Sequence, residues 1–197
     1  MRRWIVAMTG STGAIFGVRL LELLRSQEVE VHLVLSKWAE RTIEHETSYS
    51  VAQVKALADC VHSEKNQAAS ISSGSFKTEG MVLIPCTMKS LAAIAYGLGE
   101  NLVIRAADVV LKERRKLILV PRETPLNDIH LENMLKLSRM GVRIVPPMPA
   151  FYNHPQSLDD MINHICARVL DQMGLDAEVA KRWDGEMRSK APIVPEA

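Results

Sequence analysis

The chain has 197 residues, which is enough for one substantial hydrophobic core but short for two ordinary domains. Its 24 basic and 23 acidic residues give a formal net charge of +1, so no overall field would concentrate nucleic acid or an anionic membrane around the molecule. Hydrophobic residues make up 47% of the chain and charged residues 24%, a composition typical of a packed globular protein and not of a disordered one.

The N-terminal part of the chain predicts a β-α-β unit. The apolar run from Trp4 to Met8 predicts a strand, and the Gly-Ser-Thr-Gly turn at residues 10–13 ends it. Apolar residues then recur on one helical face over residues 15–24. Glu30 to Leu35 predicts a second strand, after which Ser36 caps a second helix by accepting hydrogen bonds from its free N–H groups.

Three more short apolar runs predict strands that are buried on both faces of a parallel sheet. They are Met81–Ile84, Leu117–Val120 and Val142–Val145. We place helices at Val51–Asp59, Met88–Tyr96, Leu102–Arg114 and Ile129–Met140, and a last helix from the capping box at Ser157 to about Met173. This pattern predicts a single α/β domain over residues 1–174, built as a three-layer, doubly wound parallel sheet, and a C-terminal tail over residues 175–197.

The cysteines Cys60, Cys86 and Cys166 are odd in number and far apart. No Cys-x-x-Cys and no histidine at metal-ligand spacing accompanies them, so we expect neither a disulfide framework nor a metal site. The apolar stretch after the N-terminal arginines is too short for a signal sequence, and no run approaches the length of a membrane span. These features favour a cytoplasmic protein without a membrane partner.

The glycine turn at residues 10–13 follows the first strand, at the sheet edge where ligands bind in open parallel sheets. Its glycines allow close approach of a phosphate, its two hydroxyls can donate to one, and the next helix offers its positive end. The alternative is a tight turn that needs glycine only for its geometry. The glycine spacing differs from the NAD fingerprint, Ser36 stands where that fingerprint has an acid, and the Walker A lysine is missing.

Polar residues also follow the later strands. Residues 85–90 (Pro-Cys-Thr-Met-Lys-Ser) predict a turn whose N–H groups and hydroxyls could hold a ring edge or a phosphate, the alternative being simple capping by Thr87. Cys86 has no histidine nearby in the sequence, and a free cysteine is usually a small buried hydrophobe. Arg105, Asp108 and Lys112 share one helical face, for which a salt-bridged solvent surface is the favoured interpretation.

Arg122 and Glu123 lie between Pro121 and Pro125, directly after a predicted strand. At this edge Arg122 could clamp a phosphate while Glu123 handles a proton, and the alternative is a loop ion pair.

Five motifs, taken together and in order, resemble those of the UbiX/Pad-type flavin prenyltransferases over nearly the whole chain. They are Met8-Thr9-Gly10-Ser11-Thr12-Gly13, Arg105-Ala106-Ala107-Asp108-Val109, Leu111-Lys112-Glu113-Arg114-Arg115, Val120-Pro121-Arg122-Glu123-Thr124-Pro125 and Pro149-Ala150-Phe151-Tyr152. The resemblance implies a Rossmann-like, flavodoxin-like subunit that binds FMN and assembles into a dodecamer with its sites at subunit interfaces. Members of this family alkylate reduced FMN at N5 and C6 with dimethylallyl phosphate, and the product serves a UbiD-type decarboxylase.

The same resemblance implies roles for individual residues. The FMN contacts would come from Gly10, Ser11, Thr12, Ser36, Thr87, Met88, Lys89, Ser90 and Arg122. The prenyl phosphate would be surrounded by Lys112, Glu123, Tyr152 and Arg168, with Arg105 nearby and Trp183 over the allyl group. The catalytic residues would be Glu123, Lys112, Thr12 and Arg122, and no metal is required if Lys112, Arg122 and Arg168 converge on the leaving phosphate.

Thr12 is a departure from the family pattern, since many members have serine there. The hydroxyl is kept, but the added methyl stiffens the rotamer, which bears on the rate or on the proton path at N5. Two alternatives follow: a direct FMN-dependent decarboxylase of phenolic or aromatic acids, and a noncatalytic FMN carrier, favoured if Thr12 disables the chemistry.

Overall fold

Six parallel strands form one sheet in the computed structural model, which describes residues 2–185. The strands are β1 (Arg2–Met8), β2 (Val29–Leu35), β3 (Cys60–Ser63), β4 (Gly80–Cys86), β5 (Lys116–Pro121) and β6 (Arg143–Ile144), in the order β3-β2-β1-β4-β5-β6. The order reverses between β1 and β4, so the sheet is doubly wound. The predicted Rossmann-like fold in a single domain is confirmed.

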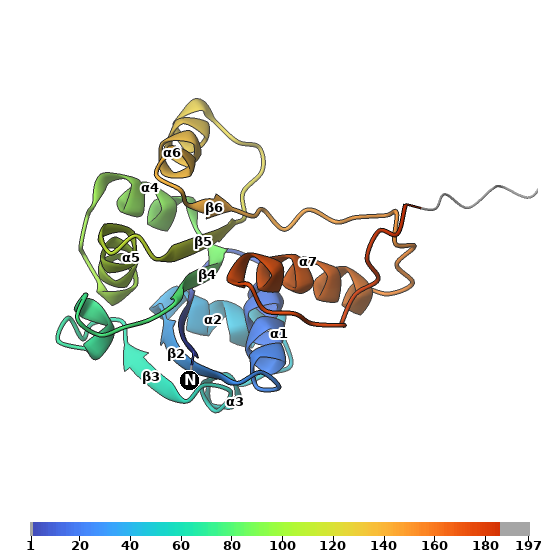
Figure 1. Cartoon of the computed structure of the whole chain (residues 1–197), viewed down its shortest axis with the longest axis horizontal. Coiled ribbons are helices and arrows are strands. Elements are labelled where there is room, and N and C mark those ends of the chain that lie inside the picture. The colour runs from blue at the N-terminus through green and yellow to red at the C-terminus, as the bar shows by residue number, and fades with distance from the viewer. Residues whose placement is uncertain (1, 186–197) are drawn as a thin grey trace, which may run out of the picture.

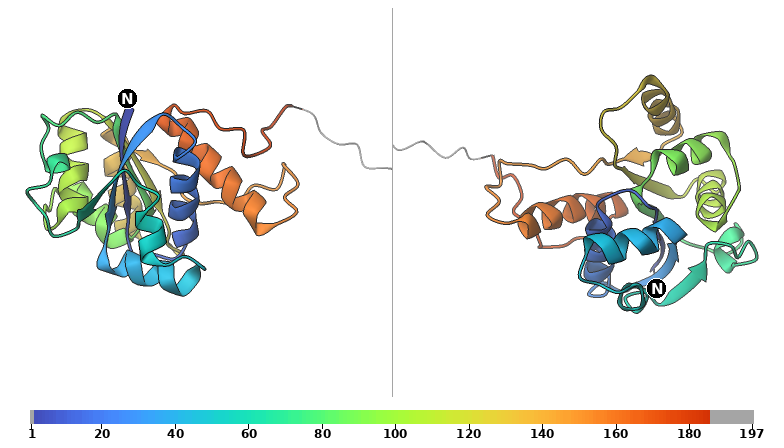
Figure 2. Two further views of the ribbon diagram at one scale, coloured as in Figure 1. Left: turned by 90° about the horizontal axis from the view of Figure 1, so that it is seen from below. Right: turned by 180° about the vertical axis from the view of Figure 1, so that it is seen from behind.

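The helices cover both faces of this sheet (Figures 1 and 2). They are α1 (Ala14–Leu24), α2 (Lys37–Glu46), α3 (Val51–Lys55), α4 (Met88–Tyr96), α5 (Leu102–Lys112), α6 (Asp128–Arg139) and α7 (Leu158–Met173), with a 3-10 turn at Ser70–Ser72. One hydrophobic core lies under α1, α2 and α7, and a second lies under α4 and α5. None of the helices in residues 2–185 is both long and apolar enough to cross a bilayer.

Strand β1 contributes to both cores at once. Trp4, Val6 and Met8 point into the core under α1 and α7, whereas Ile5 and Ala7 point into the core under α4 and α5. Side chains alternate across a strand, so a strand covered on both faces needs apolar residues at every position. This requirement explains the unbroken apolar run from which the strand was predicted.

Most predicted elements lie within one or two residues of the observed ones, and the exceptions lie mainly at the sheet edges. Strand β3 was not predicted, and α3 ends at Lys55 and not at Asp59. The sequence of β3, Cys-Val-His-Ser, alternates between half-buried and exposed positions and pairs only with β2, so it lacks an apolar run. Strand β6 likewise pairs only with β5 and has two residues, not the four predicted.

An arm extends from the sheet beyond β6. The segment 145–157 leads away from the sheet in Figures 1 and 2, α7 returns toward the sheet, and residues 175–185 run back along that helix. Leu175 is buried in the core under α7, and Arg182 bonds Asp171 on that helix at 2.7 Å. The start of the predicted tail thus packs on its own chain, whereas residues 186–197 lie outside the described residues. The boundary at residue 174 stays a prediction.

Gly17 offers a test of the packing between α1 and the sheet. A Cβ atom there would lie 2.6 Å from both the Ile84 carbonyl oxygen and Met8 Cε. We expect Gly17→Ala to lower the free energy of unfolding by about 1–3 kcal/mol through overpacking. Thermal unfolding at fixed protein concentration would show this as a fall in Tm of about 2–4 °C per kcal/mol for a chain of this size. Gly99→Ala is the control, because nothing lies within 4 Å of its added methyl; equal Tm values for the two variants would contradict the expectation.

Candidate functional site

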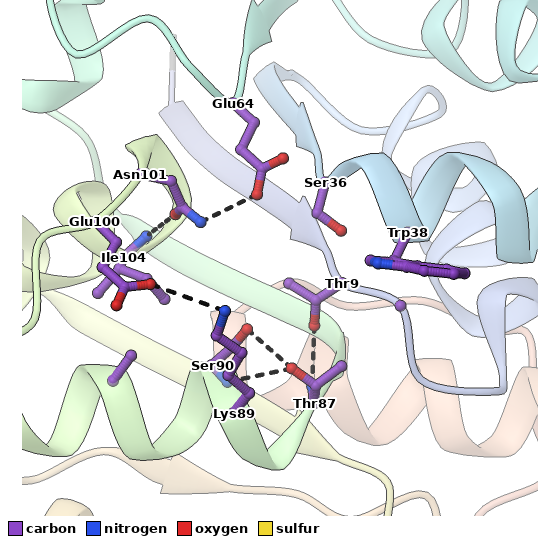
Figure 3. A pocket seen from close by; sticks show the side chains of 12 residues that line it. Thr9, Ser36, Trp38, Glu64, Thr87, Lys89, Ser90, Glu100, Asn101 and Ile104 are labelled. Carbon is purple, nitrogen blue, oxygen red and sulfur yellow. Dashed lines mark hydrogen bonds and ion pairs between the residues drawn. The ribbon is translucent and has the colours of Figure 1, made fainter.

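A cleft of about 240 Å³ opens at the carboxyl ends of the strands, at the point where the strand order reverses. The segments that follow β1, β2, β3 and β4 line one side, and the start of α5 closes the other. The lining residues are Thr9, Gly10, Ser36, Trp38, Glu64, Thr87, Lys89, Ser90, Ala93, Glu100, Asn101 and Ile104. In Figure 3 the hydroxyl-bearing side chains of Thr9, Thr87 and Ser90 meet in the middle of this lining.

Thr9 links the end of β1 to the turn after β4. Its side chain is buried, and its Oγ1 donates to the Pro85 carbonyl at 3.0 Å and accepts the Thr87 N–H at 2.9 Å. Thr87 in turn caps α4, because its Oγ1 accepts the Ser90 N–H at 3.1 Å and donates to the Ser90 hydroxyl at 2.9 Å. This chain of hydrogen bonds fixes the N-terminus of α4 at the edge of the cleft.

The opposite wall of the cleft is formed where the turn after β1 packs closely against the first turn of α2. Ser36 caps α2 by accepting the Ala39 N–H at 3.1 Å, as predicted. A Cβ atom at Gly10 would lie 2.3 Å from Trp38 Cβ, so only glycine lets the first turn of α2 come this close. The indole of Trp38, which is 69% exposed, therefore stands beside the cleft.

Glu64 joins three elements at the rim of the cleft. Its carboxylate accepts the Lys37 N–H at 3.1 Å and the Asn101 side-chain amide at 3.0 Å. Asn101 also caps α5 by accepting the Ile104 N–H at 3.0 Å. The lining residues that were not predicted are Thr9, Trp38, Glu64, Ala93, Glu100, Asn101 and Ile104. The asparagine before a helical pattern was a readable capping signal, whereas Glu64 follows the strand that was not predicted.

The predicted anion cradle at the glycine turn needs a correction. The first N–H groups of α1, from Gly13 and Ala14, both donate to Oε2 of Glu46, at 2.8 and 3.1 Å. A carboxylate from α2 thus occupies the positive helix end that was expected to receive a phosphate. The Ser11 hydroxyl is buried and has no hydrogen-bond partner within residues 2–185, so it retains bonding capacity for a ligand.

Thr12 lies away from the cleft, on a second and more apolar cavity. This cavity has a volume of about 630 Å³, and the segment after β6 and α7 line it from the other side. Its walls include Phe16, Pro147, Leu158 and Ile162. Thr12 thus faces the arm, whereas Gly10, two residues earlier, faces the cleft.

Arg105 and Lys112 lie on α5 in ion pairs, which agrees with the favoured interpretation of that helix face. Arg105 bonds Asp108 at 2.8 Å and the Ser72 carbonyl oxygen at 3.2 Å. Lys112 pairs with the neighbouring Glu113, which lowers the pKa of that carboxyl. Both cations remain partly exposed.

Arg122 and Glu123 are both exposed in the loop after β5. The Glu123 carboxylate accepts the Thr124 N–H at 3.1 Å, and in the part of the chain that the structure describes neither side chain forms an ion pair. The alternative of a loop ion pair is therefore wrong. Cys86 is fully buried, and burial raises the pKa of its thiol, which argues against a nucleophilic role.

A third group of predicted residues lies on the arm. The Tyr152 ring makes edge contacts with His164 and Trp183, with ring centroids 5.6 and 5.7 Å apart. Burial lowers the pKa of His164, and the charge of Arg168 acts in the same direction. Arg168 itself bonds Asp171 at 2.5 Å on the next turn of α7. His164 was not predicted, because a lone histidine in a helical pattern carries no distinguishing signal.

One chain therefore assembles only part of the predicted site. Gly10, Ser36, Thr87, Lys89 and Ser90 line one cleft together. The residues predicted to hold a prenyl phosphate are divided between α5, the loop after β5 and the arm. Helices α5 and α7 cover opposite faces of the sheet (Figure 1), so these groups do not meet within one chain.

Comparison with known proteins gives extensive matches. A family model described as Flavoprotein matches residues 1–170. A probable UbiX-like flavin prenyltransferase from a Streptomyces species is 63% identical over 190 residues, covering 96% of this chain and 95% of that protein. Flavin prenyltransferase LpdB from Lactiplantibacillus plantarum is 53% identical over 187 residues, covering 94% of this chain and 100% of that protein.

Solved structures match equally well. A dodecameric FMN-dependent UbiX-like decarboxylase from Escherichia coli superposes with a TM-score of 0.92 at 64% identity, covering 93% of this chain and all of that one (100%). AnUbiX in complex with FMN and dimethylallyl pyrophosphate gives a TM-score of 0.93 at 53% identity, covering 94% of this chain and 99% of that one.

The Thr9 hydroxyl gives a test of how the cleft is held together. We expect Thr9→Val to lower the free energy of unfolding by about 1–3 kcal/mol, because it leaves the partly buried Thr87 N–H without its acceptor. The Pro85 carbonyl loses one of its two donors and keeps the Thr9 N–H at 3.1 Å. Thr9→Ser keeps the hydroxyl and should retain most of the stability. Thermal unfolding of the two variants beside the parent protein measures the difference, and a valine variant as stable as the serine variant would remove Thr9 from this role.

Proposed function

Because this chain belongs to the Flavoprotein family and, within it, to the UbiX-like flavin prenyltransferases, we propose that it transfers a dimethylallyl group from dimethylallyl phosphate to reduced FMN. The observation that carries the proposal is the 63% identity to one such protein over 96% of the chain. Reduced FMN, when bound, supplies the nucleophilic N5 and the ring carbon C6 that receive the dimethylallyl group. The residues of this chain would bind and orient FMN and dimethylallyl phosphate, and would transfer the protons.

We propose the cleft at the end of the sheet as the FMN site. Its lining offers the hydroxyls of Ser36, Thr87 and Ser90, the N-terminus of α4, and Lys89, whose side chain is 85% exposed. Helix N-termini and hydroxyls are donors that suit a phosphate or a carbonyl-rich ring edge. Ser11 follows Gly10 directly, and its buried hydroxyl has no partner among residues 2–185, so a flavin bound against Gly10 would supply the acceptor or donor that it lacks. Arg122 is proposed to reach the same flavin from the loop after β5.

We propose that a homo-oligomer, a dodecamer as in the Escherichia coli relative, brings the divided prenyl-phosphate residues together. Two observations support this assembly. Arg105 and Lys112 lie on the opposite face of the sheet from Tyr152, Arg168 and Trp183, so another copy must supply one of the two groups. The arm also exposes large apolar side chains, with Phe151 at 67%, Leu158 at 77% and Trp183 at 53%, which a neighbouring copy would cover.

The proposed residues suit the cleavage of an allylic C–O bond. The departing phosphate gains negative charge, which Lys112, Arg122 and Arg168 would stabilise. Carboxylates already hold Lys112 and Arg168 in place, so these two need little reorganisation. The allyl fragment gains positive charge, which the faces of Tyr152 and Trp183 would tolerate. Glu123 would move the proton required for ring closure. Thr12 lines the neighbouring cavity, so it would serve near N5 only where the flavin ring extends past Gly10 toward that cavity.

The deciding experiment is incubation of the protein with reduced FMN and dimethylallyl phosphate, followed by mass analysis of the extracted flavin. A mass increase by one dimethylallyl group would support the proposal, and an unshifted mass would favour the noncatalytic carrier. A parallel incubation with dimethylallyl diphosphate identifies the preferred donor.

A second candidate function is direct FMN-dependent decarboxylation of an aromatic acid. It is favoured by the description of the Escherichia coli relative as a decarboxylase. Purified protein that releases CO₂ from a phenolic acid without any second protein would establish it.

We further propose that the flavin product passes to a UbiD-type decarboxylase and that the protein is cytoplasmic. The free thiols of Cys60, Cys86 and Cys166 support a reducing compartment.

Glu123→Gln tests the proton-transfer role. The amide keeps the size of the side chain but cannot exchange the proton, so prenylation should slow by about 10²–10⁴-fold while FMN binding is retained. Glu132→Gln, on the exposed face of α6, is the matched control. Single-turnover assays with bound FMN measure both rates, and full turnover by Glu123→Gln would exclude the role.

Lys112→Ala tests the phosphate contact. Loss of a charged hydrogen bond to the prenyl phosphate should lower kcat/KM for that substrate by about 10- to 100-fold and leave FMN affinity unchanged. Lys77→Ala, another exposed lysine, should leave kcat/KM as it is. An unchanged kcat/KM for Lys112→Ala would remove this residue from the site.

A further inference from the structure

A cluster of three potential metal ligands lies on β2 and β3, outside the residues assigned to the FMN and prenyl-phosphate sites. His32 is paired with Cys60 in the register of the two strands, and His62 follows two residues later on the same face of the sheet. The ligand atoms of these side chains all lie within 4.8 Å of one another. No pattern in the sequence indicated this cluster. Cys60 and His62 lie on β3, which was not predicted, and His32 lies 28 positions before Cys60.

The separations within the cluster approach those around a metal ion. His32 Nδ1 lies 2.8 Å from His62 Nε2, and Cys60 Sγ lies 3.4 Å from the same nitrogen. In tetrahedral coordination with bonds of about 2.0–2.3 Å, neighbouring nitrogen and sulfur ligands are separated by about 3.3–3.6 Å. Small side-chain rotations would open the first pair to that distance, and the edge strand that carries Cys60 and His62 is paired on one side only.

The surroundings of His32 orient it as a ligand. Its Nε2 lies 2.9 Å from the Glu30 carboxylate, and Arg3 holds that carboxylate by an ion pair of 2.8 Å. A proton on Nε2 donated to Glu30 leaves the lone pair of Nδ1 directed at Cys60 and His62. Hydrogen bonding of a histidine to a carboxylate on the side away from the metal is a recurrent feature of zinc sites. The His32 ring is further fixed by stacking on His62 and by an edge contact with Phe76, each at 5.1 Å between centroids.

We propose that His32, Cys60 and His62 bind one divalent transition-metal ion of the Zn²⁺ type, with Glu30 as the positioning residue. Two imidazoles and one thiolate are ligands that Zn²⁺ prefers, and three protein ligands leave a fourth position for water. Binding releases the thiol proton of Cys60 to solvent, while the proton on His62 Nε2 moves to Nδ1 of the same ring. His32 is buried, whereas Cys60 and His62 are partly exposed, which gives the ion a path from solvent.

The bound ion would clamp the edge strand β3 to β2. Glu64 follows β3 directly and joins α2 to α5 at the rim of the cleft. The ion would therefore stabilise this edge of the sheet and needs no part in the transfer reaction. The metal site can thus be tested independently of the proposed function.

The test uses the full chain without a histidine tag, freed of metal by a chelator and titrated with Co²⁺. We expect one equivalent to bind per chain with a thiolate-to-cobalt charge-transfer absorption, displacement of Co²⁺ by Zn²⁺, and a rise in Tm with Zn²⁺ that a chelator reverses. Cys60→Ser should abolish the charge-transfer band, because Cys86 and Cys166 are buried elsewhere. Glu30→Gln should weaken affinity by about 10- to 100-fold.

His130→Gln is the matched control for His62→Gln. His130 is partly exposed on α6, and glutamine can replace it in the capping box with Asn127, so metal binding and stability should both be kept. His62→Gln should lower the Co²⁺ affinity at least tenfold. Circular dichroism and the metal-free Tm of each variant establish that it is folded; should His62→Gln fail this check, Cys60→Ser at the strand edge decides alone. The proposal is overturned if the parent protein shows no charge-transfer band, or if Cys60→Ser binds Co²⁺ with the parent affinity.

Discussion

Burial of the two central strands on both faces is the constraint on which the rest of this structure depends. Strands β1 and β4 lie side by side between helices that cover each face, so every side chain from Trp4 to Met8 and from Met81 to Cys86 is buried. Polar groups can then appear only where the strands end. The chain leaves β1 and β4 toward opposite faces, and the gap between the two exits is the cleft.

The cleft keeps its shape because the polar groups at the strand ends bond one another. The Thr9 hydroxyl accepts the Thr87 N–H and so links the two central strands, and the Thr87 hydroxyl accepts the Ser90 N–H in the first turn of α4. Gly10 allows Trp38 to approach from the other side. A preorganised lining of this kind places donors without cost at the moment a flavin binds, which is consistent with the family to which the chain belongs.

The division of charged residues between opposite layers makes the subunit an incomplete catalyst in our proposal. Each cation on α5 and α7 is already paired with a carboxylate, which keeps it extended and oriented while it remains partly exposed. An arm bearing exposed aromatic side chains is suited to carry one such group to the other layer of a neighbouring copy. The edge strand β3, at the other side of the sheet, carries the proposed metal ligands and leads directly to Glu64 at the cleft.

The sequence by itself determined the layers, the edge of the sheet at which the cleft opens, and the family. Unbroken apolar runs predicted β1, β4 and β5 because doubly covered strands need them. Ser36 was predicted as a helix cap that follows a strand, and capping by Thr87 was one of two alternatives. Five motifs in order predicted the family that the comparisons then identified. Only the tertiary structure decided that Glu46 occupies the N-terminus of α1, that Thr12 faces the arm, and that His32 meets Cys60 and His62. Each of these contacts joins residues about 30 or more positions apart, or residues on a partly exposed edge. These contacts depend on how strands and helices pack in space, which the local periodicity of the sequence does not predict.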